Sequence, residues 1–231
     1  MALFPRAAGV AYGPAMRLYG KWQRVLAIGL AFVAGFVDAI GFLKLGGLFV
    51  SFMSGNSTRL AVGTVLRDRA ALTAATLILA FVIGVALGAS VGRLAGDRRK
   101  VVVLAFVTSL LVLAASATVL RDPTVPTLLM AAAMGAANDV FQRDGEVSVG
   151  VTYMTGTLVK FAQHLAAVPF GGARTAWLPY LLLWIGLVAG AVAGAAAFAM
   201  LELRALWVAA GLAASLTAFA AAAGRLRRDR R

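Results

Sequence analysis

Residues 52–60 read FMSGNSTRL, and this short polar stretch lies inside an apolar segment that runs from residue 48 to residue 66. A glycine, several hydroxyl or amide side chains and the positive charge of Arg59 are unusual in such a segment. The pattern returns 101 positions later as YMTGTLVKF at residues 153–161. The shared core is a methionine, a small hydroxyl residue, a glycine, a polar residue and, four positions after the glycine, a base. Two matched interruptions predict that the chain uses them together.

Around these stretches the chain is strongly apolar. Of its 231 residues, 61% are hydrophobic and 13% are charged, and the mean hydropathy is +0.89. Soluble domains are typically about 45–50% apolar and about 25% charged. The apolar segments are continuous and rich in Ala, Leu and Gly, as in membrane-spanning helices, whereas a β-barrel would show short alternating segments. We therefore expect an all-α integral membrane protein that contacts the lipid bilayer.

The net charge of +13 comes from bases that gather at the ends of the apolar segments. They include Arg17, Lys21 and Arg24, then Arg98, Arg99 and Lys100, and finally Arg225, Arg227, Arg228, Arg230 and Arg231. Such clusters are typical of cytoplasmic flanks that contact anionic lipids. We expect a multi-pass protein of the inner (plasma) membrane, with both termini in the cytoplasm and no nucleic-acid partner.

The sequence also limits the chemistry that the chain can perform. It contains no cysteine and a single histidine, so a disulfide, a thiol nucleophile and a Cys- or His-based metal cluster are excluded. No nucleotide-binding loop or nucleophile motif is present. We therefore expect no cofactor, no metal and no enzymatic activity.

The chain divides into a basic lead, two similar halves and a basic tail, which together form one membrane domain. The lead covers residues 1–24, the halves 25–122 and 123–224, and the tail 225–231. Apolar segments cover residues 25–45, 48–66, 70–91 and 101–120, then 125–142, 147–168, 176–201 and 205–224. The two sets of four align without a gap at an offset of 101, which matches Asp38 with Asp139 and Gly55 with Gly156. Internal repeats are a common plan in transporters.

The number of spans is open at this point. If residues 48–66 and 147–168 are broken, re-entrant segments, the chain has six transmembrane helices and two inverted halves. If both segments cross, it has eight spans and parallel halves. We favour six spans, because only that arrangement places Arg93, Arg98, Arg99 and Lys100 on the cytoplasmic side.

The candidate binding residues lie at the two interruptions and in the segments before them. They are Asp38, Ser54, Gly55, Asn56, Arg59, Asn138, Asp139, Thr155, Gly156, Thr157 and Lys160. A glycine lets the backbone leave the helix, and in lipid the exposed backbone groups need partners or water. Charges at such depth are costly and are typical of functional sites. In the alternative interpretation, Asp38 pairs with Arg59, Asp139 pairs with Lys160, and the small residues only pack helices together.

Two further glycine series show Gly-xxx-Gly spacing, at residues 84, 88 and 92 and at residues 186, 190 and 194. This spacing places small residues on one helix face and lets two backbones approach closely. We expect these faces to serve packing, for example of residues 70–91 against residues 176–201.

Two sets of motifs resemble the signatures of a known family. AGFVDA at residues 34–39, LGGLF at 45–49 and MSGN at 53–56 resemble the first signature of the YoaK-like bacterial membrane proteins, a domain of unknown function. MGAAND at 134–139 and TYMTGTL at 152–158 resemble its second signature. The chain departs from the family pattern at Ser54, Ala137 and Asp139, so the resemblance does not support an essential role for Asp139. It implies a polytopic inner-membrane protein and carries no activity.

The sequence favours a transporter or channel for a small solute, with its site formed by the two Ser/Thr-Gly-Asn/Thr interruptions. Arg59 and Lys160, together with the positive ends of the helices that start there, favour a small anion or a carboxylate-bearing solute. The alternative is a non-transporting assembly or regulatory protein in which the interruptions are packing features.

Overall fold

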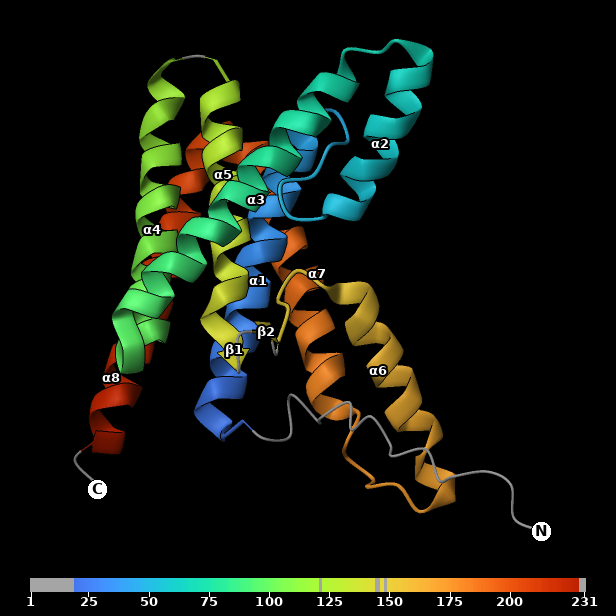
Figure 1. Cartoon of the computed structure of the whole chain (residues 1–231), viewed down its shortest axis with the longest axis vertical. Coiled ribbons are helices and arrows are strands. Elements are labelled where there is room, and N and C mark those ends of the chain that lie inside the picture. Colours follow the sequence, from blue (N-terminus) through green and yellow to red (C-terminus); the bar gives the residue numbers. More distant parts are fainter. Residues whose placement is uncertain (1–18, 121, 144–145, 148, 229–231) are drawn as a thin grey trace.

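The computed structural model describes residues 19–120, 122–143, 146–147 and 149–228. Residues 1–18 of the basic lead and the last three residues of the tail lie outside this part. The described chain forms eight α-helices (Figure 1): α1 (Lys21–Lys44), α2 (Met53–Leu66), α3 (Ala70–Ala95), α4 (Arg99–Ala117), α5 (Thr124–Ala137), α6 (Met154–Ala166), α7 (Leu178–Leu201) and α8 (Leu206–Arg228). The short strands β1 (Gln142–Arg143) and β2 (Glu146–Val147) pair antiparallel. The predicted helical class is confirmed, apart from these two-residue strands.

Three helical stretches of the described chain are long and apolar enough to cross a membrane. They are Lys21–Lys44, Ala70–Leu120 and Leu178–Leu226, with mean hydropathies of 2.2, 2.5 and 2.2. The first is α1 alone. The second holds α3 and α4 and the third holds α7 and α8, each pair joined by a short 3-10 turn, η1 (Gly96–Arg98) or η5 (Glu202–Ala205).

Helices α2 and α6 are much shorter than the others. With 14 and 13 residues, each reaches about 20 Å, well under the ~30 Å of a bilayer core. Figure 1 shows both helices starting near mid-height of the bundle. From there α2 runs to the upper end, where α3 begins, and α6 runs to the lower end, away from α2. Each is therefore a half-length helix that begins in the middle of the molecule.

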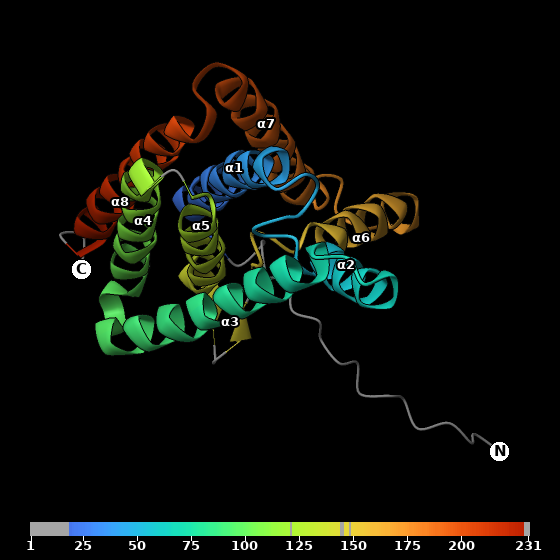
Figure 2. The same cartoon turned by 90° about the horizontal axis from the view of Figure 1, so that it is seen from above.

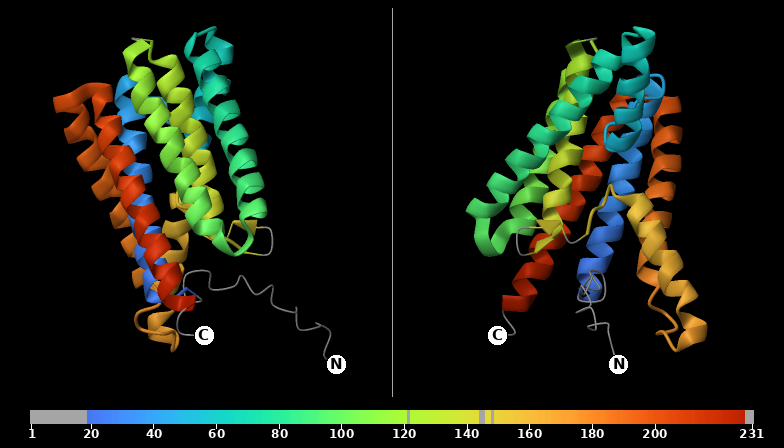
Figure 3. Two further views of the ribbon diagram at one scale, coloured as in Figure 1. Left: turned by 90° about the vertical axis from the view of Figure 1, so that its left-hand side faces the viewer. Right: turned by 45° about the vertical axis from the view of Figure 1, so that its right-hand side comes forward.

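The core of the bundle is built on α1 and α5. Seen from above, the longer helices α3, α4, α7 and α8 lie around these two, and both half-length helices lie on one side (Figure 2). Of the most apolar 18 residues of α1, 61% are buried inside the protein. The corresponding share is 22% in each of the stretches Ala70–Leu120 and Leu178–Leu226. Figure 3 shows the same arrangement from the side, with α2 and α6 on a shared flank. The exposed apolar side chains of the outer helices suit contact with lipid.

Helix α1 packs against α7 with the two backbones in direct contact. A Cβ atom added to Gly35 of α1 would collide with the carbonyl of Leu187, and one added to Gly190 of α7 would collide with the carbonyl of Phe32. Only glycine permits such an approach. The predicted packing role of the second glycine series is correct, but its partner is α1.

Helix α5 packs against α3 in the same way. Gly135 of α5 faces the carbonyl of Phe81, and Gly84 of α3 faces the carbonyl of Ala132, with no room for a Cβ atom at either glycine. The expectation that residues 70–91 pack on residues 176–201 is therefore wrong. Each glycine-rich helix packs instead on the central helix of the other half.

The matching contacts do not share one offset. Gly35 and Gly135 lie 100 residues apart, whereas their partners Phe81 and Leu187 lie 106 residues apart. The half-length helices begin at Met53 and Met154, which are 101 residues apart. The gapless alignment therefore holds at α2 and α6 but shifts in the helices around them.

Candidate functional site

The first interruption begins where α1 ends. Gly46 and Gly47 both have positive φ angles, of 63° and 99°, and the N–H of Gly47 donates to the carbonyl of Phe42 at 2.9 Å. This turn sends the chain back along α1, where Gly41 leaves space for Val50; a Cβ atom at Gly41 would lie 2.7 Å from that side chain. The returning stretch is non-helical and ends at Met53, where α2 begins.

The carboxylate of Asp38 holds this returning stretch from α1. Its Oδ1 atom accepts the backbone N–H groups of Val50 and Ser51, each at 2.8 Å. These N–H groups have no helical partner, and an unpaired backbone group in an apolar surrounding costs several kcal/mol. The alternative in which Asp38 forms an ion pair with Arg59 is therefore wrong.

The side-chain amide of Asn56 holds the same stretch from α2. It accepts the N–H of Phe49 at 2.9 Å and donates to the carbonyl of Phe49 at 2.6 Å. Asn56 is completely buried. Its amide therefore supplies the backbone pairing that the interruption removes.

The second interruption is held differently, through a bond between two side chains. Asn138 lies in the 3-10 turn η3 (Asn138–Phe141) that follows α5. Its Oδ1 atom accepts the hydroxyl of Thr152 at 3.1 Å, and its amide donates to the carbonyl of Met134 at 3.1 Å. Thr157 stands where Asn56 stands in the first half, but its hydroxyl donates only to the carbonyl of Tyr153 at 3.2 Å.

The starts of α2 and α6 carry unpaired backbone donors. Neither helix has a side-chain cap, and the described residues supply no acceptor for the N–H groups of Ser54 and Gly55 in α2 or of Thr155 and Gly156 in α6. Ser54, Thr155 and Gly156 are exposed. These four predicted residues therefore mark two open helix N-termini near mid-height of the bundle (Figure 1).

Arg59 and Lys160 lie further along the two half-length helices. Each follows its helix start by six residues, which places it about 9 Å from that start. Both side chains are exposed, and the guanidinium of Arg59 covers Gly47, where a Cβ atom would lie 2.6 Å from Nη2. Because α2 and α6 run apart, the two bases flank the helix starts from opposite ends.

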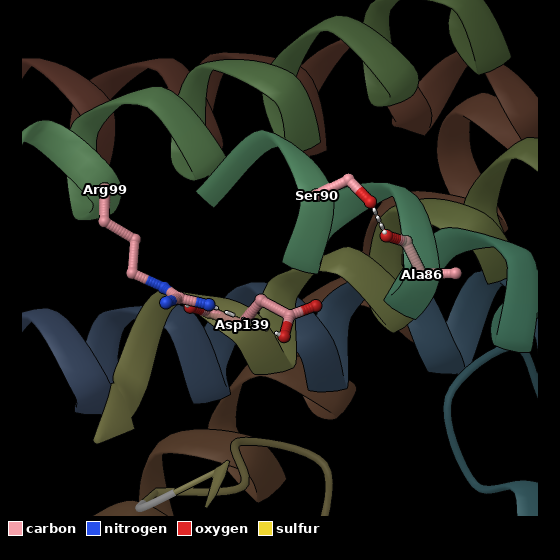
Figure 4. Close-up of polar contacts among 4 residues, drawn as sticks. All are labelled: Ala86, Ser90, Arg99 and Asp139. Carbon is pink, nitrogen blue, oxygen red and sulfur yellow. Dashed lines mark hydrogen bonds and ion pairs between the residues drawn. The ribbon is translucent and has the colours of Figure 1, made fainter. Parts of the chain in front are cut away.

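Asp139 does not join either interruption. Although it follows Asn138, it faces α3 and α4, where its Oδ1 atom lies 4.0 Å from Nη2 of Arg99 (Figure 4). The alternative pairing of Asp139 with Lys160 is therefore wrong. Arg99 was missed because its neighbours Arg98 and Lys100 make it look like part of a solvated basic turn. In the structure Arg99 also covers Gly92 of α3, where a Cβ atom would lie 3.0 Å from Nε.

No group of three or more His, Cys, Asp or Glu side chains that could hold a metal ion gathers within the described ranges. The predicted residues other than Arg59 and Lys160 are divided among the two interruptions, the two helix starts and a separate position. Asp38 and Asn56 hold the first interruption, Asn138 and Thr157 lie at the second, and Asp139 stands apart. The open N-termini lie between the first two.

Comparison with known proteins identifies relatives but no activity. A family described as "Protein of unknown function (DUF1275)" matches residues 26–219. The chain is also similar to the UPF0700 transmembrane protein RA0705 of Rhizobium meliloti, with 36% identity over 196 residues, which cover 84% of each chain. No solved structure matches the chain. The resemblance to an uncharacterised family of membrane proteins is confirmed.

Proposed function

The chain belongs to the DUF1275 family, whose function is unknown, and from this premise we propose that it is a transporter or channel for a small solute rather than an enzyme. The observation that carries the proposal is the pair of half-length helices, which start near mid-height and run to opposite ends of the bundle (Figures 1 and 3). Half-length helices that begin at the midplane are a recurring way to build solute and ion sites in transporters.

In the proposed arrangement, six helices span the bilayer and α2 and α6 are re-entrant. Helices α1 and α5 run antiparallel, as do α3 and α7, so the two halves are inverted with respect to each other (Figure 1). The crossed contacts Gly35–Leu187 and Gly135–Phe81 support this internal repeat, because they have the same form in both halves. Inverted halves with two discontinuous segments are typical of proteins that give alternating access to a central site.

The chemistry at the helix starts favours an anionic solute. The unpaired N–H groups at the starts of α2 and α6 point out of the positive ends of two helix dipoles, which attract negative charge. Arg59 and Lys160 add full positive charges about 9 Å from these starts. Asp38 and Asn56 hold the non-helical backbone in place, and the solute contacts come from Ser54, Thr155 and the exposed N–H groups.

We infer the orientation in the membrane from the distribution of bases. The lower end of the bundle in Figure 1 carries the start of α1, the α3–α4 turn and the end of α8. Its bases include Lys21, Arg24, Arg93, Arg98, Lys100 and Arg225. Lysine and arginine accumulate in cytoplasmic loops. In the proposed arrangement the protein lies in the inner membrane, and this end of the bundle faces the cytoplasm. Anionic lipid headgroups contact the same bases.

Water access to the helix starts tests the proposal. The chain has no cysteine, so Ser54→Cys and Thr155→Cys each introduce a single thiol. We expect both to react with a water-soluble maleimide in intact membranes. Leu79→Cys on α3 and Val192→Cys on α7 are matched controls, because both side chains are more than half exposed, at 59% and 66%, and face lipid. They should remain unlabelled.

Protection at both helix starts would contradict a solute site there. It would favour the alternative of a non-transporting assembly or regulatory protein. The observation behind this alternative is that the Asn56 amide already pairs with both backbone groups of Phe49. Transport itself is measured by anion uptake and current in proteoliposomes over a broad panel of small anions and carboxylates. The absence of solute-dependent flux for the whole panel would contradict the transport proposal.

A further inference from the structure

A buried carboxylate and a guanidinium meet where α3, α4 and η3 pack together (Figure 4). Nε of Arg99 donates to the main-chain carbonyl of Asp139 at 3.0 Å, and the guanidinium Nη2 lies 4.0 Å from the carboxylate Oδ1. Asp139 is only 1% exposed. Nη2 of Arg99 and Oδ2 of Asp139 are both buried and have no hydrogen-bond partner among the described residues. The ion pair is therefore loose, and both partners keep unused hydrogen-bonding capacity.

Nearby polar groups on α3 do not complete the pair. The hydroxyl of Ser90 donates to the carbonyl of Ala86 in its own helix at 2.8 Å (Figure 4). Gly88 of α3 also faces this carboxylate, and a Cβ atom there would lie 2.8 Å from Oδ2. There is no space for a side chain at this point. The unpartnered oxygen faces a closely packed helix.

The packing of this region does not require charges. In the corresponding contact of the other half, α1 packs against α7 and the start of α8. At the offset of 100 that relates Gly35 to Gly135, Ala39 corresponds to Asp139. The residues that lead into α8, Ala205 and Leu206, are apolar and fully buried. The other half of the chain thus has apolar side chains at the positions that correspond to Asp139 and to the start of α4.

The energetic balance therefore points to a role other than stability. Removing two charges from water costs several kcal/mol per ion, and the mutual attraction repays this cost only when the geometry is good and the remaining hydrogen bonds are made. Neither condition is met at Arg99 and Asp139.

A proton is the ligand that fits this place. It needs no cavity, and it converts the unpartnered carboxylate oxygen into a neutral hydroxyl. The charged groups near Asp139 are Arg99 and Lys100 from α4 and Arg93 from α3, as far as the described side chains show. We propose that Asp139 is a proton-binding residue, and that its protonation releases the side chain from Arg99. A hydronium ion transfers its proton to Oδ2, so that one O–H bond of hydronium breaks, one O–H bond forms on the carboxyl group and a water molecule is left; the carboxylate charge is neutralised while Arg99 stays charged.

Infrared spectroscopy of the protein in lipid nanodiscs tests this site without knowledge of any solute. The protein is acidified from about pH 9 to about pH 4, a range that brackets most protein carboxyl groups. We expect a carbonyl band from a protonated, buried carboxyl to appear in Asp38→Asn, which removes the other embedded aspartate, and to be lost when Asp139→Asn is added to it. A band that persists in the double variant, or is absent from Asp38→Asn, would overturn the proposal.

A second variant decides the question if Asp139→Asn fails to fold. Arg99→Gln keeps a polar side chain but removes the positive charge beside the carboxylate. We expect a larger protonated fraction than in the native protein at the same pH, because the charge that favours the carboxylate is gone. If the band follows the same course in Arg99→Gln and in the native protein, the two residues are not coupled and the proposal is wrong. Lack of solute flux would not affect this result, so the site and the transport proposal are tested separately.

Discussion

The side-chain amide of Asn56 pairs with both backbone polar groups of Phe49, accepting the N–H at 2.9 Å and donating to the carbonyl at 2.6 Å. A side chain thus takes the place of a backbone partner at the point where the chain leaves the helical state. This pairing allows a non-helical stretch to exist deep in an apolar protein. The strength of the pairing can be measured.

Asn56→Ala should destabilise the protein by about 2–6 kcal/mol, because two part-buried backbone groups lose their partners at about 1–3 kcal/mol each. Unfolding in mixed detergent micelles, followed by circular dichroism, gives the free energy. Ser57→Ala is the matched control one residue away, since its exposed hydroxyl donates only to the carbonyl of Met53. Equal losses in both variants would contradict the assigned role of Asn56.

Asp38→Asn and Asp38→Leu separate hydrogen bonding from charge. The asparagine oxygen can still accept the N–H groups of Val50 and Ser51, so its cost should stay below about 1.5 kcal/mol. The leucine leaves both donors unpaired, and the expected loss is about 2–5 kcal/mol. The same unfolding measurement applies. Equal losses in the two variants would show that the negative charge, which both of them remove, is what matters.

Gly190→Ala should separate α1 from α7. The added methyl group would collide with the carbonyl of Phe32, and overpacking against backbone that cannot yield costs about 3 kcal/mol or more. Gly211→Ala in α8 is the control, because a Cβ atom there meets nothing within 4 Å. This control should be neutral or stabilising by up to about 1 kcal/mol. Thermal unfolding in detergent distinguishes the two, and a native melting temperature for Gly190→Ala would refute the close contact.

Thr108 and Thr217 join α4 to α8 through their hydroxyl oxygens, which lie 3.1 Å apart. Replacing each with valine, singly and together, gives a double-mutant cycle. We expect a coupling free energy of about 0.6 kcal/mol, the average for hydrogen bonds between membrane helices. Each hydroxyl also lies within hydrogen-bond distance of a carbonyl of its own helix. Because each carries one proton, one hydroxyl donates to its own carbonyl and accepts the O–H of the other. A coupling energy of zero would mean that the two hydroxyls do not interact.

Local features of this fold follow from the sequence. The polar stretches predict an interruption to within a few residues, and the half-length helices start at Met53 and Met154, inside the two quoted stretches. The expectation that the backbone leaves the helix at Gly55 and Gly156 is wrong, because both glycines lie inside α2 and α6, and in the first half the turn is made earlier, at Gly46 and Gly47. The cost of unpaired backbone in an apolar setting makes such stretches visible without any structure. The helical class and the family resemblance can also be predicted, because both depend on the order of neighbouring residues along the chain.

Contacts between distant segments could not be predicted in this way. The glycine spacing shows that a helix face packs closely but not which helix it meets, and α3 meets α5 rather than α7. An aspartate in an apolar run is equally consistent with an ion pair and with a cap for stray N–H groups. Asp38 serves as the cap, whereas Asp139 lies beside Arg99, and only the fold separates these roles.

The crossed contacts between the halves bear on how the protein is made. When a ribosome has synthesised only the first half, Gly35 of α1 lacks its later neighbour Leu187. Phe81 of α3 likewise lacks Gly135. Early helices must therefore remain loosely associated within the bilayer until late ones are inserted. Two separately expressed halves should each be degraded rapidly, yet protect one another when they are produced together in the same cell.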